Sequence, residues 1–125
     1  MATFKRFEDI QAWKKARQAT RKVYELTGEP TFARDFGLRD QLRRAAVSVM
    51  ANIAEGFGRR SDKEFANFLN NAHGSGAEAQ SHLYVALDLG YIDELTFSTL
   101  YKLFDEVSRM TMSLSTHLRK PKPTP

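Results

Sequence analysis

The sequence of 125 residues contains no cysteine, which excludes disulfide bonds, thiolate metal sites and cysteine nucleophiles together. It also lacks any apolar run close to the roughly 18 residues that a membrane-spanning helix needs. The first ten residues, MATFKRFEDI, do not contain the apolar core of a signal peptide. We therefore expect a soluble protein of the cytoplasm, and the lack of cysteine is compatible with that compartment.

Catalytic and cofactor-binding signatures are lacking as well. The sequence has no phosphate-binding loop, no dinucleotide fingerprint and no Ser/His/Asp order. Carboxylates on facing helices of a bundle can hold two metal ions, but such sites use a Glu-x-x-His spacing, whereas Glu78 and His82 are four residues apart. An acid–base pair of Glu55 and Glu78 has no stronger support. The sequence therefore predicts no enzymatic activity, no metal and no cofactor.

Four segments show the apolar spacing of three to four residues that is typical of helices, and none alternates as a strand does. They span about residues 7–27, 35–58, 61–90 and 93–119. Ser61 and Glu64 form a capping-box pattern, and Asp93 is a suitable N-cap. Such helices with short connections predict an all-α, antiparallel up-down four-helix bundle in one domain, residues 1–119. The proline-rich end, residues 120–125, is predicted to be a disordered tail.

The expected buried faces follow from the same spacing. In the first segment, one stripe contains Phe7, Ile10, Trp13, Ala16, Thr20, Val23 and Tyr24. The second segment has one stripe of Leu38, Leu42, Ala46, Val49, Ile53 and Gly56, and beside it another of Val47, Met50, Ala54 and Phe57. A helix in a monomeric bundle needs only one buried stripe. The extra stripe favours a homo-oligomer in which a neighbouring subunit covers it, although long neighbouring helices could also cover it.

Polar side chains interrupt the apolar second and third segments. One polar stripe contains Ser48, Asn52 and Glu55, and another contains Ser75, Glu78 and His82. If these stripes face each other, their side chains can pair, as buried polar groups must, and fix the register of the two helices. We therefore assign five of these residues to a structural polar network: Ser48, Asn52, Glu55, Ser75 and Glu78.

Two glycines, Gly74 and Gly76, lie in the middle of the third segment. Each costs roughly 1 kcal/mol of helix stability against alanine. We expect both to lie against the alanine-rich part of the second helix, since a glycine in mid-helix is easiest to explain where another backbone packs closely against it.

Basic residues are concentrated in the first half of the chain, although the net charge of +4 is mild. Eight of them are spaced along helix faces: Lys14, Arg17, Arg21, Arg39, Arg43, Arg44, Arg59 and Arg60. If these faces adjoin, they form a positive strip that suits the phosphates of RNA or DNA, and a ring of subunits would multiply the contacts. One alternative is a solvated face with local ion pairs, such as Arg21 with Glu25. Another is an interaction scaffold whose basic face binds an acidic protein partner.

Five stretches together resemble one known family. They are FEDIQAWKKA (7–16), FGLRDQLRRAAVSVMANIAEGFGR (36–59), EFANFL (64–69), GSGAE (74–78) and LGYI (89–92). The combination is similar to the 23S rRNA intervening-sequence proteins, which are small four-helix-bundle proteins encoded within bacterial large-subunit ribosomal RNA genes and elsewhere in bacterial genomes. The resemblance covers nearly the whole chain. Gly76 and Ala79 stand where the family more often has Ala and Leu, which should affect packing more than fold.

The resemblance implies a left-handed antiparallel bundle that assembles into a homopentamer and has no established enzymatic activity. A distant relative is the accessory variability determinant protein of diversity-generating retroelements, which resembles a basic pentameric barrel that binds nucleic acid and a reverse transcriptase. This similarity strengthens the expectation of nucleic-acid binding. A reverse-transcriptase partner would follow only from a matching genomic context, since fold alone does not assign a partner.

Overall fold

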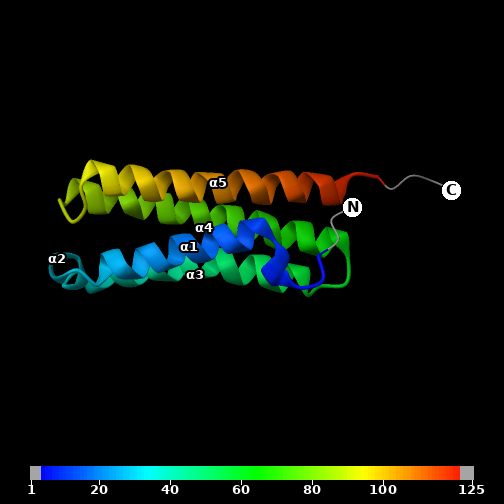
Figure 1. Cartoon of the computed structure of the whole chain (residues 1–125), viewed down its shortest axis with the longest axis horizontal. Coiled ribbons are helices and arrows are strands. Elements are labelled where there is room, and N and C mark those ends of the chain that lie inside the picture. The colour runs from blue at the N-terminus through cyan, green and yellow to red at the C-terminus, as the bar shows by residue number, and fades with distance from the viewer. Residues whose placement is uncertain (1–3, 122–125) are drawn as a thin grey trace.

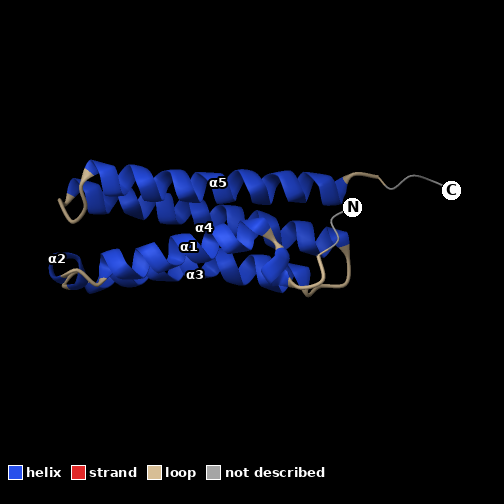
Figure 2. Ribbon diagram, viewed as in Figure 1, coloured by secondary structure: helices blue, strands red, loops and turns tan. Residues whose placement is uncertain are grey.

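The computed structural model describes residues 4–121 and consists of helices, with no strand in that range. The long helices are α1 (Gln11–Thr27), α3 (Phe36–Phe57), α4 (Asp62–Asp88) and α5 (Glu94–Arg119), and the short elements are η1 (Phe7–Asp9) and α2 (Pro30–Ala33). Figure 1 shows that consecutive long helices run in opposite directions along the long axis of the molecule. Short loops join them (Figure 2). The prediction of an all-α protein with four long helices is confirmed.

The four long helices surround one core. α1 packs against α3 and α5, and α4 packs against the same two helices. The contacts of α4 with both neighbours are more extensive than those of α1. The four helices are therefore arranged around the core in the cyclic order α1, α3, α4, α5. The side formed by α1 and α3 lies opposite the side formed by α4 and α5.

Side-chain caps fix where three of these helices begin. Asp35 Oδ1 accepts a hydrogen bond from the Leu38 amide at 3.1 Å, and Ser61 Oγ accepts one from the Glu64 amide at 3.1 Å. Asp93 Oδ1 accepts one from the Thr96 amide at 2.8 Å. These bonds satisfy amides that have no partner within the first turn of a helix.

The first predicted helix is interrupted. Ile10 is extended, with φ −76° and ψ 120°, so the segment from residue 7 divides into η1 and α1. Asp9 Oδ2 accepts hydrogen bonds from the amides of Lys5 (3.1 Å) and Arg6 (3.2 Å), which closes a turn ahead of Ile10. Ile10 is 1% exposed and enters the core from this turn.

α1 buries a stripe that matches the predicted one only in part, at Ala16 and Val23. Its buried residues are Ala12, Ala16, Ala19, Val23 and Thr27. Trp13 and Thr20 are only partly buried, and Tyr24 is 44% exposed. Small side chains let α1 approach its neighbours closely, so the helix turns its alanines inward and leaves the larger rings at the edge of the core.

The second apolar stripe of α3 is covered in part by the chain itself. Met50 and Phe57 pack against the core as partly buried side chains, and Ala54 is also partly buried. Val47 is 42% exposed. Neighbouring helices of the same chain therefore cover most of this stripe, which was the alternative to cover by a second subunit. Val47 is the residue of the stripe that a partner subunit could still cover.

α3 and α4 approach most closely at Gly56. A Cβ atom at Gly56 would lie 2.6 Å from Phe68 Cβ and 3.0 Å from Phe65 Cδ1. The predicted contact of Gly74 and Gly76 with α3 is wrong. Gly76 faces α5, with Ser108 Oγ 3.4 Å from its Cβ position, and nothing lies within 4 Å of that position in Gly74. Residues two positions apart on a helix point in directions about 200° apart, so Gly74 and Gly76 cannot pack against the same neighbouring helix.

The predicted disordered tail, residues 120–125, lies largely outside the described residues. The last helical residue is Arg119, and Lys120 is extended, with φ −67° and ψ 141°.

Candidate nucleic-acid interface

Arg43 joins α3 to α1. Its Nε donates a hydrogen bond to Thr27 Oγ1 at 2.7 Å. Its guanidinium carbon lies 4.6 Å from the centroid of the Tyr24 ring. A planar guanidinium over an aromatic ring is attracted by the negative ring face. Arg43 is therefore held in a defined position at the seam between the two helices, with the edge of Tyr24 exposed beside it.

Two further arginines lie over aromatic rings on the same pair of helices. Arg17 lies 5.9 Å from the centroid of Trp13 on α1. Arg39 lies 4.8 Å from the centroid of Phe36 on α3, and its Nε donates to Asp40 Oδ1 at 2.8 Å. The hydrogen bond from Arg39 holds the pKa of the Asp40 carboxyl below its ordinary value. At three places on the α1–α3 side of the bundle, a guanidinium group thus lies next to an aromatic ring.

Three more of the predicted basic residues lie on these two helices without an ion-pair partner among residues 4–121. They are Lys14, Arg21 and Arg44, and all three are exposed. Thr20 Oγ1 donates to the Ala46 carbonyl at 3.3 Å, so α1 and α3 are in contact along the stretch between Arg21 and Arg44. We call these six residues the α1–α3 basic face: Lys14, Arg17, Arg21, Arg39, Arg43 and Arg44.

The structure does not bring Arg59 and Arg60 into the α1–α3 basic face. Arg59 is 16 residues beyond Arg43, which corresponds to about 24 Å along a helix. Its Nη2 lies 2.6 Å from Glu55 Oε2 and its Nη1 lies 4.0 Å from Glu64 Oε2, so its charge is largely offset. Its guanidinium carbon is 4.8 Å from the centroid of Phe68 on α4. The eight predicted residues therefore form a face of six and a separate pair.

Three of the five predicted network residues lie together at the seam of α3 and α4. Ser48 Oγ and Ser75 Oγ are 2.8 Å apart. Asn52 Nδ2 donates to the Ser48 carbonyl at 2.8 Å and to Ser48 Oγ at 3.1 Å. Glu55 instead bonds to Arg59. Glu78 is exposed and has no hydrogen bond or ion pair with any residue in the described range. The network is thus smaller than predicted, because both carboxylates point to solvent.

The charges of the bundle are unequally divided between its two halves. α1 and α3 together contain eight basic and three acidic residues, whereas α4 and α5 contain four basic and seven acidic residues. The α1–α3 half is therefore positive and the opposite half negative. Such a division directs polyanions to one side of the molecule.

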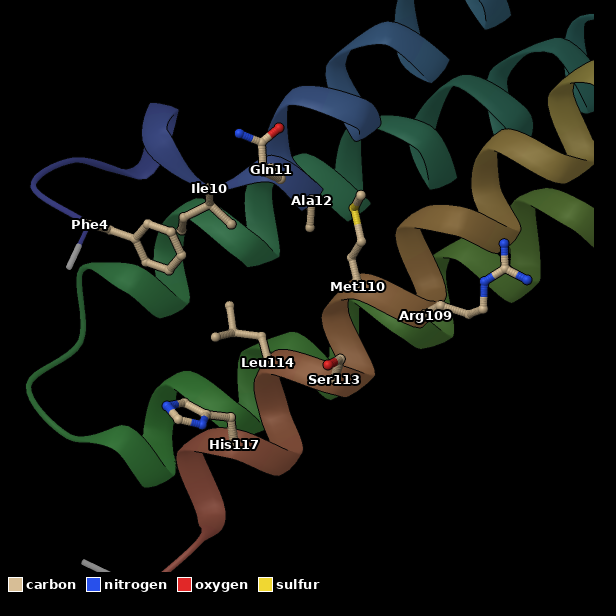
Figure 3. Close-up of a pocket in the computed structure, with 9 residues that line it drawn as sticks. All are labelled: Phe4, Ile10, Gln11, Ala12, Arg109, Met110, Ser113, Leu114 and His117. Atoms are coloured by element: carbon tan, nitrogen blue, oxygen red, sulfur yellow. The ribbon is translucent and has the colours of Figure 1, made fainter. Parts of the chain in front are cut away.

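An open apolar groove of about 550 Å³ lies at the seam of α1 and α5, near the N-terminal end of α1. Figure 3 shows Phe4, Ile10, Met110 and Leu114 around one space, with Arg109 directed away from it. Arg109 pairs with Asp105 at 3.1 Å. The groove is therefore lined mainly by apolar side chains, and Gln11, Ser113 and His117 are the other polar side chains that line it.

Within residues 4–121, no three His, Cys, Asp or Glu side chains are grouped so as to hold a metal ion. None of the helices in that part of the chain is both long and apolar enough to cross a bilayer.

The arginine–aromatic pairs are what sequence reasoning missed. Trp13 with Arg17 and Phe36 with Arg39 have the i,i+4 and i,i+3 spacings at which helix side chains meet, so these two pairs could have been found. The pair of Arg43 with Tyr24 joins two helices, and only the rotation of α1 in the bundle shows it.

Comparison with known proteins agrees with the fold. The sequence profile of the 23S rRNA-intervening sequence protein family matches residues 8–113. A crystal structure of a protein of unknown function from the S23 ribosomal protein family of Bacteroides thetaiotaomicron has a TM-score of 0.76 to this chain. The two share 21% identity, with 82% of this chain and 96% of that chain covered. No curated protein is significantly similar. Because the family profile spans most of its length, the chain belongs to the 23S rRNA-intervening sequence protein family.

Proposed function

We propose that this protein binds RNA or DNA electrostatically through the α1–α3 basic face, in the cytoplasm and without catalysis. The observation that supports this most directly is that three arginine–aromatic pairs lie on one pair of helices together with the exposed Lys14, Arg21 and Arg44, which have no ion pair within residues 4–121. Guanidinium groups and lysines bind phosphate, and aromatic rings stack on bases. No base-reading helix motif accompanies them, so the binding is expected to be weakly sequence-specific.

The salt dependence of such binding follows from the number of cations. A basic side chain that neutralises a phosphate of duplex nucleic acid releases counterions. The logarithm of the binding constant therefore falls linearly with the logarithm of the salt concentration, with a slope of about −0.9 for each phosphate contact. If all six residues of the basic face contact phosphates, affinity should fall by about 1,000-fold between about 50 and 200 mM salt. A ring of subunits would steepen this dependence.

A charge-reversal experiment tests the proposal. Arg21→Glu with Arg44→Glu changes two exposed, unpaired cations of the basic face, so the fold should survive. Lys63→Glu with Lys102→Glu makes the same change of net charge on α4 and α5, where both lysines are exposed, and is the matched control. We expect the first double variant to lose most RNA binding in fluorescence anisotropy and to lower the salt slope by about 2. The control should bind nearly as the unaltered protein does.

Equal affinity in all three proteins would contradict the proposal, as would equal losses in both variants. Loss of binding in the control alone would place the interface on the α4–α5 half. If an acidic polypeptide binds at salt concentrations where RNA does not, the alternative of a scaffold for an acidic protein partner is favoured.

We further propose that the chain assembles as a homopentamer of left-handed bundles. Exposed apolar side chains on α3, on α4 and at the C-cap of α4 support association: Val47 is 42%, Val85 44% and Leu89 55% exposed. Side chains of this kind lose unfavourable contact with water when another subunit covers them. A closed ring would also place several basic faces on one particle, which strengthens binding to a long polyanion.

A further inference from the structure

A hollow lies at the end of the bundle where α2 meets α3 and the loop after α4 comes alongside. Its volume is about 610 Å³, and it is lined by Thr31, Arg34, Asp35, Phe36, Gly37 and Tyr91. The lining thus combines two aromatic rings, a cation, a carboxylate and two hydroxyl groups within one open space. Neither the fold nor the phosphate-binding function proposed above explains this combination.

Phe36 is the most exposed ring near the basic face, at 65% exposure. A phenylalanine this exposed keeps about two-thirds of its contact with water on folding, so its burial contributes little to the stability of the bundle. Arg39 lies 4.8 Å from its centroid and is itself held by Asp40 at 2.8 Å and by the Ala33 carbonyl at 3.4 Å. The ring therefore has a fixed guanidinium beside it and most of its surface free to stack.

Asp35 and Tyr91 provide a polar edge beside this ring. The Tyr91 hydroxyl donates to Asp35 Oδ2 at 3.0 Å, and Asp35 Oδ1 accepts from the Leu38 amide. The hydrogen bond to Asp35 raises the pKa of the Tyr91 hydroxyl above its ordinary value. An ionised carboxylate has about four acceptor positions, so Asp35 can accept further hydrogen bonds from the N–H groups of a base.

The charges around the hollow suit the phosphates on either side of such a base. Arg34 is exposed and has no ion pair within residues 4–121. Arg39 and Arg43 follow Phe36 at one and two turns along α3, and so continue from the hollow into the α1–α3 basic face. A strand that crosses the basic face would therefore reach the hollow at its end.

We propose that this hollow binds one unpaired base of the nucleic acid, stacked on Phe36 with its edge against Asp35. This inference rests on the proposed nucleic-acid binding and adds a ligand class to it, namely single-stranded loops or ends. Bases within a duplex are stacked on each other and cannot reach a ring on the protein, whereas bases in loops can turn outward and stack on aromatic side chains.

The test compares a hairpin that has an unpaired loop with a fully paired duplex of equal phosphate number, each as RNA and as DNA. We would measure affinity by anisotropy, and stacking by quenching of 2-aminopurine placed in the loop. Phe36→Ala removes the ring, and Phe36→Trp restores a ring in its place. Tyr84→Ala is the matched control, because Tyr84 is another exposed ring, at 51% exposure, on α4.

We expect the unaltered protein to bind the hairpin more tightly than the duplex and to quench the loop fluorophore. Stacking on one ring corresponds to a loss of about 5- to 150-fold in hairpin affinity for Phe36→Ala. Duplex affinity should change little, Phe36→Trp should recover the hairpin affinity, and Tyr84→Ala should change neither. Equal binding of hairpin and duplex that Phe36→Ala leaves unaltered would overturn this inference while leaving phosphate binding intact. Absence of binding to every probe would overturn both.

Discussion

The close approach of α3 and α4 at Gly56 leads to the sharpest prediction on stability. In Gly56→Ala the new Cβ would lie 2.6 Å from Phe68 Cβ, whereas ordinary contact starts near 3.4 Å. The helices would therefore have to separate locally by about 0.8 Å. Overpacking of this kind costs about 1–3 kcal/mol, and alanine recovers about 1 kcal/mol of helix propensity. We expect a net loss of up to about 2 kcal/mol in the free energy of unfolding, and a correspondingly lower Tm.

Gly74→Ala is the matched control, because Gly74 is on the same pair of packed helices but has no atom within 4 Å of its Cβ position. This variant should gain about 0.5–1 kcal/mol from helix propensity alone. Urea and thermal unfolding followed by circular dichroism, at one protein concentration, would measure both variants. A Gly56→Ala protein that gains as much stability as Gly74→Ala would refute the argument, since it would show that α3 and α4 can separate at no cost.

Two further predictions concern capping and assembly. Asp93→Ala removes the cap of α5 and should lower the unfolding midpoint at pH 7. The hydrogen bonds from Thr96 hold the pKa of Asp93 below its ordinary value of 3.8, so this stabilisation is present above that value and is lost as pH falls through the folded-state pKa. The midpoints of the two proteins should therefore converge in acid, and a gap that stays constant would show that ionisation is irrelevant to the cap. Light scattering should give a mass about five times the 14.3 kDa of one chain, and the mass of a single chain would rule out the pentamer.

Local signals in the sequence were sufficient to locate most helix ends. Ser61 and Asp93 were predicted as caps from spacing alone and accept the expected hydrogen bonds. The buried stripe of α3 was also predictable, because a period of 3.6 residues leaves little choice of face when apolar residues are so regular. The break at Ile10 was not, since it depends on Asp9 bonding to amides four and three residues before it.

The candidate site was less predictable because it depends on how the helices are rotated against each other. Apolar spacing placed Tyr24 in the core, but Tyr24 is 44% exposed and meets Arg43 at the surface, while Ala19, which was outside the predicted stripe, is buried. Likewise, the basic residues were predicted as one strip. Their positions along the length of α3, and the pairing of Arg59 with Glu55, separate them into two groups.

The smaller contact of α1 with the rest of the bundle bears on its dynamics. Native proteins open locally, and the parts with the fewest buried contacts open at the lowest free energy. α1 buries mainly alanines, packs less extensively than α4, and borders the apolar groove at its N-terminal end. It is therefore the helix whose transient detachment costs least. Because α1 supplies half of the basic face, a polyanion that bridges α1 and α3 would hold the bundle closed, and binding would appear as slower amide exchange throughout α1.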